Sequence, residues 1–201
     1  MTKLAIMSDL HIDLNHFSTF ETKTLINLLK KEKIDHLHIA GDISNHFTKD
    51  TLPFINNLKK HIKLSYNLGN HDMLDLTETE IQRLDFQTYR FDKKMLLAFH
   101  GWYDYSFSNN RDIKDVVFGH AHRSFGDVKI GETTYHSRPL GYIREWNLTI
   151  DFVNQNPNHN PNLTWNLSKR YNAVKHLDSF KNYPKKYFED ELRNSMTIFD
   201  C

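Results

Sequence analysis

Gly69-Asn70-His71-Asp72 stands directly after the apolar run 62–68, and this stretch decides how the whole sequence is interpreted. The apolar run predicts a buried strand, so the four residues fall where a strand ends and a loop begins. Loops at the ends of parallel strands are where α/β proteins usually place their chemistry. Glycine lets the backbone turn tightly, and the other three residues supply an amide oxygen, an imidazole and a carboxylate. Because a polar turn after a strand often has this composition, its meaning depends on the other strand ends.

Composition predicts one domain with a proper core, since the chain has 201 residues, 39% of them hydrophobic and 25% charged. The formal net charge of +1 gives no field for nucleic acid or an anionic membrane, so we expect neither as a partner. The only cysteine, Cys201, excludes an internal disulfide framework and fits a reducing compartment. The apolar run 4–7 is too short for a signal peptide or a spanning helix. We therefore expect a cytoplasmic protein, and its oligomeric state stays open.

The first third of the chain alternates between strand and helix patterns. Strands are predicted at 3–7, 34–40 and 62–68, and helices at 19–31 and 51–60. This order predicts a parallel sheet with right-handed crossovers, and an α/β fold.

Beyond residue 76 the pattern changes from alternating helices and strands to a run of strands. Thr77 and Glu80 form a capping box for a short helix, and a tail from residue 163 has the spacing of two helices. We divide the chain into a domain over 1–153 and a loop with a helical C-terminal extension, packed on the domain, over 154–201. The strands predicted in this part are 86–91, 95–99, 115–118, 125–130, 133–136 and 146–153.

Polar residues follow several of the predicted strands in a fixed order. The blocks are Asp9-x-His11, Gly41-Asp42, Gly69-Asn70-His71-Asp72, a single His100, and Gly119-His120-x-His122. Each block alone is unremarkable, but their order closely resembles the signature of the calcineurin-like metallophosphoesterase superfamily. The resemblance covers about residues 1–150 and implies a sandwich of two mixed β-sheets flanked by helices. An ordered set of this kind is far more specific than any single short motif.

The resemblance implies a centre with two divalent metal ions. Oxygen and nitrogen ligands without a thiolate suit Mn²⁺, Fe or Zn²⁺. Two such ions, about 3.5–4 Å apart, need a shared ligand, and the resemblance gives that role to Asp42. The remaining ligands it implies are Asp9, His11 and His122 for the first ion, and Asn70 and His120 for the second.

The catalytic residues implied by the resemblance are His71 and Asp72. His71 would face the substrate and help the leaving oxygen depart, while Asp72 would hold its ring. The metal centre would make hydroxide available near neutral pH, which would attack phosphorus in line.

The sequence departs from the pattern around the fourth block. The segment Gly101-Trp102-Tyr103-Asp104-Tyr105-Ser106-Phe107, together with 139–145, resembles one bacterial branch of these phosphoesterases. In that branch the aromatic segment precedes the stretch with the lone metal-binding histidine, whereas here the chain passes directly to the strand before Gly119. An internal segment is therefore expected to be missing between 107 and 114. His100 either replaces the lost histidine or follows a strand by coincidence, and we favour coincidence.

Two functions of different classes follow. The first is a metal-dependent hydrolase of small-molecule phosphomonoesters or phosphodiesters. The alternative is a metal-binding or interaction protein that keeps the fold and has lost efficient catalysis, as the missing segment would allow.

Overall fold

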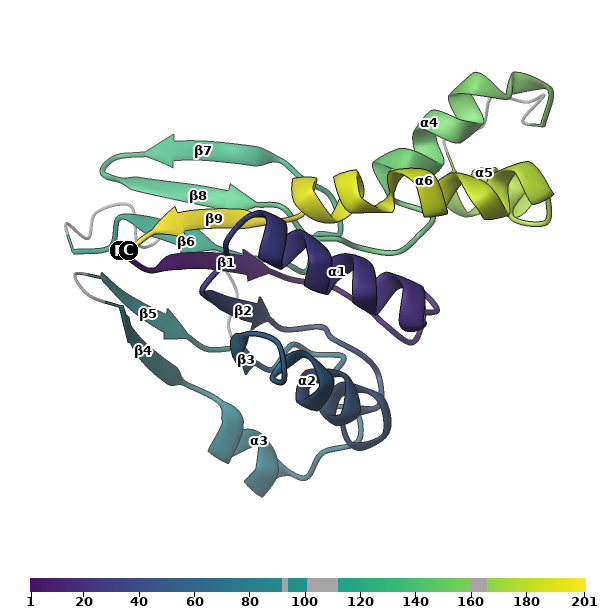
Figure 1. Cartoon of the computed structure of the whole chain (residues 1–201). Coiled ribbons are helices and arrows are strands. Elements are labelled where there is room, and N and C mark those ends of the chain that lie inside the picture. Colours follow the sequence, from purple (N-terminus) through teal and green to yellow (C-terminus); the bar gives the residue numbers. More distant parts are fainter. Residues whose placement is uncertain (92–93, 101–111, 160–165) are drawn as a thin grey trace.

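A four-stranded sheet forms the centre of the molecule (Figure 1). The computed structural model describes residues 1–91, 94–100, 112–159 and 166–201. The aromatic segment 101–107 and most of the stretch 107–114, where an internal segment is expected to be missing, therefore lie outside the described residues. The strand order is β3-β2-β1-β9, with β1, β2 and β3 parallel and β9 antiparallel to β1. The bounds are β1 Lys3–Met7, β2 His36–Ala40, β3 Lys63–Asn67 and β9 Thr197–Asp200.

Two crossovers join the parallel strands, as the sequence predicts. Helix α1 (Thr19–Lys31) begins at a capping box in which Ser18 and Glu21 bind each other's backbone N–H groups. Its buried face includes Leu25, Leu28 and Leu29, and full burial of each such side chain contributes about 1.5–3 kcal/mol. The second crossover contains a π-helical turn, η1 (Phe47–Thr51), followed by α2 (Leu52–Leu58).

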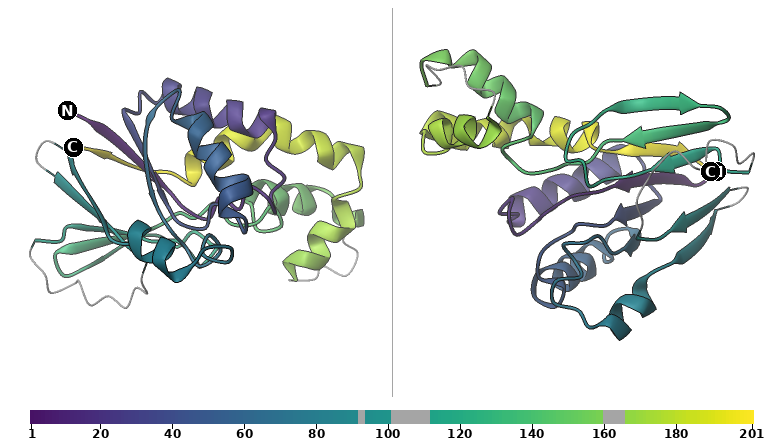
Figure 2. Two further views of the ribbon diagram at one scale, coloured as in Figure 1. Left: turned by 90° about the horizontal axis from the view of Figure 1, so that it is seen from below. Right: turned by 180° about the vertical axis from the view of Figure 1, so that it is seen from behind.

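The central sheet is buried on both faces because its strands alternate between two cores. On β1, Ala5 and Met7 belong to a core shared with the helices α1, α2 and α6 (Asp178–Asn194). Leu4 and Ile6 point the other way and pack with residues of the remaining strands. Figure 2 shows this layering, with the helices α1, α2 and α6 on one side of the sheet and the smaller sheets on the other.

The second layer consists of two smaller sheets in the described part of the chain. Strands β4 (Gln87–Phe91) and β5 (Lys94–Ala98) form the predicted antiparallel pair, which follows the capped helix α3 (Glu78–Leu84). The other sheet has the order β6-β8-β7 and includes the predicted hairpin across Gly131. Its strands are β6 Asp115–Val117, β7 Gly126–Ile130 and β8 Thr133–Ser137. The fold is the α/β architecture that the sequence predicts.

The strand predicted at 146–153 is wrong, because this stretch is helix α4 (Asn147–Gln155). Alternate apolar residues suit a strand here, but Leu148 and Phe152 are also one helical turn apart and are both buried. Packing against α6, where Glu191 accepts hydrogen bonds from the first backbone N–H groups of α4, favours the helix.

The C-terminal part contains the two predicted helices and one strand that the sequence did not reveal. Helix α5 (Leu167–Val174) ends before Leu177, and α6 then carries Phe180 and Phe188 on its buried face. Strand β9 follows and pairs with β1, so the C-terminal residues complete the central sheet. The division of the chain after residue 153 stays a prediction, and α4 spans that point.

Among the described residues, no helix is long and apolar enough to cross a membrane.

Candidate metal centre

Five of the predicted ligands have an uncommon backbone conformation on the loops that follow their strands. Asp9, His11, Asp42, His120 and His122 all have positive φ, with values of 57°, 40°, 54°, 68° and 53°. Non-glycine residues in this region carry about 1–3 kcal/mol of strain each and cluster at functional sites. The surrounding structure therefore holds these side chains in place at an energetic cost.

Two glycines of the motifs are required because the loops touch. A Cβ on Gly69 would collide with the carboxylate and backbone of Asp42. A Cβ on Gly119 would collide with the Asp9 carboxylate and lie 2.6 Å from Ser8 Oγ. Glycine at these positions lets the third and last motif loops approach the first two.

Four side chains converge at the ends of β1 and β2. Asp9, His11, Asp42 and His122 each offer one ligand atom, and these atoms lie within 4.8 Å of one another. The Nε2 atoms of His11 and His122 are 3.1 Å apart, and His122 Nε2 is 3.4 Å from Asp9 Oδ1. This group is the set predicted for the first ion together with the shared ligand.

The electrostatics of the group favour a cation. Burial raises the pKa of Asp9 to about 6, and the neighbouring Asp42 carboxylate adds to this effect. Burial lowers the pKa of His11 to about 3, so its ring is neutral and able to act as a ligand. His11 Nδ1 is buried without a hydrogen-bond partner in the described structure. Two carboxylates and two imidazoles without a thiolate match the donor set of Mn²⁺, Fe or Zn²⁺.

Glu145 orients His122, a role that the sequence did not reveal. Its Oε2 lies 3.4 Å from His122 Nδ1 and accepts a hydrogen bond of 3.0 Å from the backbone N–H of Tyr142. Burial of His122 opposes its charged form, but Glu145 and Asp9 outweigh it and raise the pKa of His122. A carboxylate behind a metal-binding histidine fixes the ring orientation and increases its basicity. The sequence points to the segment 139–145 only through its resemblance to the bacterial branch.

The loop 139–145 is fastened to the first motif loop through Asn15. The buried Asn15 side chain donates to the carbonyl oxygens of Leu10 and Gly141, and its Oδ1 accepts from the backbone N–H of Ile143. The backbone N–H of Gly141 also donates to the carbonyl of Asp9 at 3.1 Å. The loop therefore forms a fixed wall of the site.

The ligands predicted for the second ion are only partly assembled. His120 Nδ1 lies 3.1 Å from Asn70 Oδ1, and the His120 backbone N–H donates to the Asp9 carboxylate. His100 is exposed, its backbone N–H donates to Asp85 Oδ1, and it is not a member of the converging group among the described residues. Whether His100 binds a metal stays a prediction.

His71 lies beside the four converging side chains and is held by a different residue from the one expected. Its ring centroid is 4.7 Å from that of His11, and its Nδ1 is 2.6 Å from Asn45 Oδ1. Asn45 Nδ2 donates to Asp13 at 2.9 Å, so Asn45 Oδ1 can only accept and His71 Nδ1 carries a proton. Asn45 and Asp13 are therefore site residues that the sequence did not predict, although Asn45 stands three residues after Asp42.

Asp72 does not hold the His71 ring, so that expected contact is wrong. The buried Asp72 carboxylate instead accepts hydrogen bonds from the backbone N–H groups of Ile43, Ser44 and Gly69. These bonds tie the second motif loop to the third. A catalytic role for His71 and Asp72 stays a prediction.

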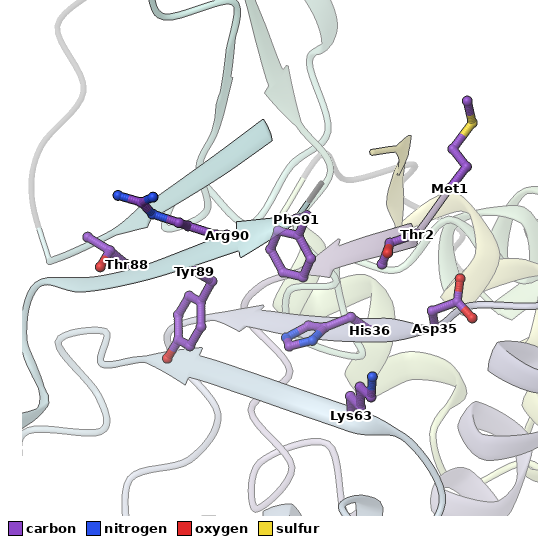
Figure 3. A pocket seen from close by; sticks show the side chains of 9 residues that line it. All are labelled: Met1, Thr2, Asp35, His36, Lys63, Thr88, Tyr89, Arg90 and Phe91. Carbon is purple, nitrogen blue, oxygen red and sulfur yellow. The ribbon is translucent and has the colours of Figure 1, made fainter. Parts of the chain in front are cut away.

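None of the remaining histidines belongs to the converging group in the described part of the chain. His38 is buried between Ser65 and Asn67, and His136 lies between Asp115 and Asp127. His36 lines a cavity of about 590 Å³ at the opposite ends of β2 and β3, and this cavity contains none of the predicted site residues (Figure 3). The exposed ones are His16, His46, His61, His159 and His176.

Comparison with known families agrees with the geometry. A model of the calcineurin-like phosphoesterase family matches residues 2–191, well beyond the region that carries the motifs. This chain belongs to the calcineurin-like phosphoesterase family. The family assignment confirms the resemblance drawn from the strand-end motifs.

Solved structures similar to this family member include the phosphoesterase YfcE from Escherichia coli, with 19% identity, a TM-score of 0.43, and coverage of 70% of this chain and 80% of that one. A predicted phosphoesterase from Streptococcus pneumoniae has 15% identity, a TM-score of 0.42 and coverage of 71% and 73%. Vacuolar protein sorting 29 from Cryptosporidium parvum has 14% identity, a TM-score of 0.48 and coverage of 68% and 73%. No curated protein sequence matches this chain.

The affinity for metal is expected to fall as the pH is lowered from 7.5 to 5.5. Asp9, with a pKa of about 6, takes up its proton in this range, and the raised pKa of His122 favours its protonated form, so both groups must lose a proton to bind a cation. Affinity should fall roughly tenfold per pH unit for each proton released. Calorimetric titration with Mn²⁺ in buffers of different ionisation enthalpy counts these protons. A constant affinity across this range would contradict the assignment of Asp9 and His122 as ligands.

Proposed function

We propose that this protein is a metal-dependent phosphoester hydrolase that holds two divalent metal ions, Mn²⁺, Fe or Zn²⁺, and acts on a small-molecule phosphoester. The observation that carries this proposal is the convergence of Asp9, His11, Asp42 and His122 beside His71. Membership of the calcineurin-like phosphoesterase family supports the same chemistry. The single cysteine also supports our proposal of a cytoplasmic location.

The side chains divide into those that hold cations and one that handles a proton. Asp9, His11 and His122 would hold one ion, Asp42 would be shared, and Asn70 with His120 would serve the second. Such ions supply hydroxide near neutral pH and offset the charge that develops on phosphoryl oxygens. The rigid loops with positive φ keep these donors in place before substrate arrives.

His71 is the residue that would move a proton to the leaving group. Its Nδ1 proton is committed to Asn45, so Nε2 is the atom left for the substrate. In the form of the ring that is protonated on both nitrogens, a proton delivered from Nε2 would make the departing alkoxide or phenoxide a neutral alcohol or phenol and leave a neutral ring with its proton on Nδ1. The Asp13–Asn45 pair fixes the ring orientation for this task.

The second candidate function, a metal-binding or interaction protein with impaired catalysis, is favoured by the incomplete second site. Within the described structure, Asn70 and His120 contact each other, while His100 is exposed elsewhere. An ion that lacks one imidazole would be held more weakly than its neighbour. The two functions differ in turnover, not in binding of the first ion.

Loading the protein with Mn²⁺ and assaying hydrolysis tests both functions. We expect two ions bound with unequal affinities, together with weak turnover of the diester bis(p-nitrophenyl) phosphate. Elemental analysis and calorimetry measure the ions, and release of p-nitrophenol measures turnover of this diester and of the monoester p-nitrophenyl phosphate. Metal binding without hydrolysis of either substrate would favour the second function. Absence of any metal under excess Mn²⁺ would overturn both, and tight binding of two ions with rapid turnover would show that the second site is complete.

A further inference from the structure

We infer that Arg144 and Tyr142 form a phosphate-binding face on the metal centre, and that the substrate is a phosphomonoester rather than a diester. The inference rests on the proposed hydrolase function and names its substrate class. Both residues belong to the loop 139–145, outside every motif block assigned above.

Tyr142 places this loop directly on the metal-binding side chains. Its ring centroid is 4.5 Å from that of His11 and 4.3 Å from that of His122, with a T-shaped contact to the latter. Tyr142 therefore borders the space into which the donors point.

Arg144 lies on Tyr142 with part of its guanidinium free. Arg144 Cζ is 4.2 Å from the centre of the Tyr142 ring, and its Nε is 3.7 Å from Glu145 Oε1. Because the Tyr142 ring contacts both His11 and His122, the guanidinium is separated from two of the predicted ligands by a single ring. The side chain is 39% exposed, and its two terminal nitrogens have no partner among the described residues. Guanidinium N–H donors in this geometry match phosphate oxygens.

The face is pre-organised by the loop that carries it. Glu145 binds the backbone N–H of Tyr142 and the ring of His122, and Asn15 binds the backbone on both sides of Tyr142. The Tyr142 ring holds the Arg144 guanidinium through a cation–π contact. Because these groups are already ordered, a bound phosphate would cost little side-chain entropy.

The charge of a monoester explains why Arg144 selects it. Above a second pKa of about 6 a phosphomonoester carries two negative charges and has three non-bridging oxygens. A diester carries one charge and has two such oxygens, so it presents less charge to a further cation. A guanidinium beside a cationic centre thus stabilises bound monoester more than bound diester.

Arg144→Gln and Arg144→Lys test the inference, with Arg83→Gln on α3 as a control that removes an exposed arginine elsewhere. In Mn²⁺-loaded protein, Arg144→Gln should weaken binding of inorganic phosphate, measured by calorimetry, by roughly tenfold to hundredfold. The KM for p-nitrophenyl phosphate should rise by a similar factor, and kcat/KM for bis(p-nitrophenyl) phosphate should change by less than about threefold. Arg144→Lys should recover part of the loss, and Arg83→Gln should behave as wild type.

Three results would overturn the inference: unchanged phosphate affinity in Arg144→Gln, equal losses on both substrates, or loss of metal from this variant. The last result would mean that Arg144 supports the ligands instead of the substrate. Absence of turnover in the wild type would instead count against the proposed hydrolase, because phosphate binding is measured without catalysis. If the wild-type protein bound no phosphate, the phosphate-binding face itself would be wrong.

Discussion

Replacing Asp42 with asparagine is expected to abolish tight metal binding, with a loss of more than about 100-fold in affinity. Changes to residues behind metal ligands already cost about 10–100-fold, and Asp42 is the carboxylate proposed to be shared by both ions. Asparagine keeps an oxygen for the hydrogen bond from the backbone N–H of His71, so the loop should stay folded. The measurements are metal content and the rise in melting temperature that Mn²⁺ produces in the wild type.

Asp190→Asn is the matched control for this change, because Asp190 is an exposed carboxylate on α6. It should bind metal as the wild type does. The melting temperature of the metal-free Asp42→Asn protein should not fall, since the substitution removes one of two repelling carboxylates from a buried group. If the variant bound Mn²⁺ with wild-type affinity, Asp42 would not be a ligand.

Replacing His71 with alanine is expected to lower turnover by about 10²–10⁴-fold while metal content stays unchanged. His71 packs against His11, but its Nδ1 is bound to Asn45, and it is not among the four converging donors. Removing the ring should therefore remove a proton donor and leave the ions in place. The measurement is kcat for p-nitrophenyl phosphate, together with elemental analysis of the same preparation.

His61→Ala provides the control for His71, because His61 is exposed after α2 and precedes β3, whereas His71 follows the other end of that strand. Its kcat should equal that of the wild type. A His71→Ala protein that loses its metals would show that His71 is a ligand, contrary to the role given to it.

The strand ends were predictable from sequence because their chemistry is local. An apolar run followed by Gly-Asp or Gly-Asn-His-Asp fixes both the end of a strand and the polar groups beyond it. The parallel strands β1 and β2 bring Asp9, His11 and Asp42 to one edge of the central sheet. His122 reaches the same place from the loop after β6, a strand of a separate sheet. The loops also require glycine where they touch, since a Cβ at Gly119 would collide with the Asp9 carboxylate.

The partners of these residues were not predictable, because several acceptors stand near each donor in the chain. Asp72 follows His71 directly, yet its carboxylate turns inward to three backbone N–H groups, and Asn45 binds the ring instead. Glu145 contacts His122 across a hairpin and a loop. Which acceptor binds which donor depends on the folded positions of the loops, and no residue spacing in the sequence indicates it.

The prediction of secondary structure was wrong where the sequence fits both a strand and a helix pattern and tertiary packing decides between them. Residues 146–153 satisfy both strand and helix periodicity, and contact with α6 selects the helix α4. Strand β9 has only four residues, Thr197–Asp200, and no turn signal of its own, so only the open edge of β1 makes it a strand.

The pairing of β1 with β9 also sets the order in which the protein matures. Lys3 lies opposite Asp200, so β1 is translated long before the strand that pairs with it (Figure 1). Until then one edge of β1 exposes unpaired N–H and C=O groups that another chain could capture. Contacts between such distant segments also slow folding, because a long loop must close before they form. This edge of β1 is therefore prone to aggregation until β9 has been translated and pairs with it.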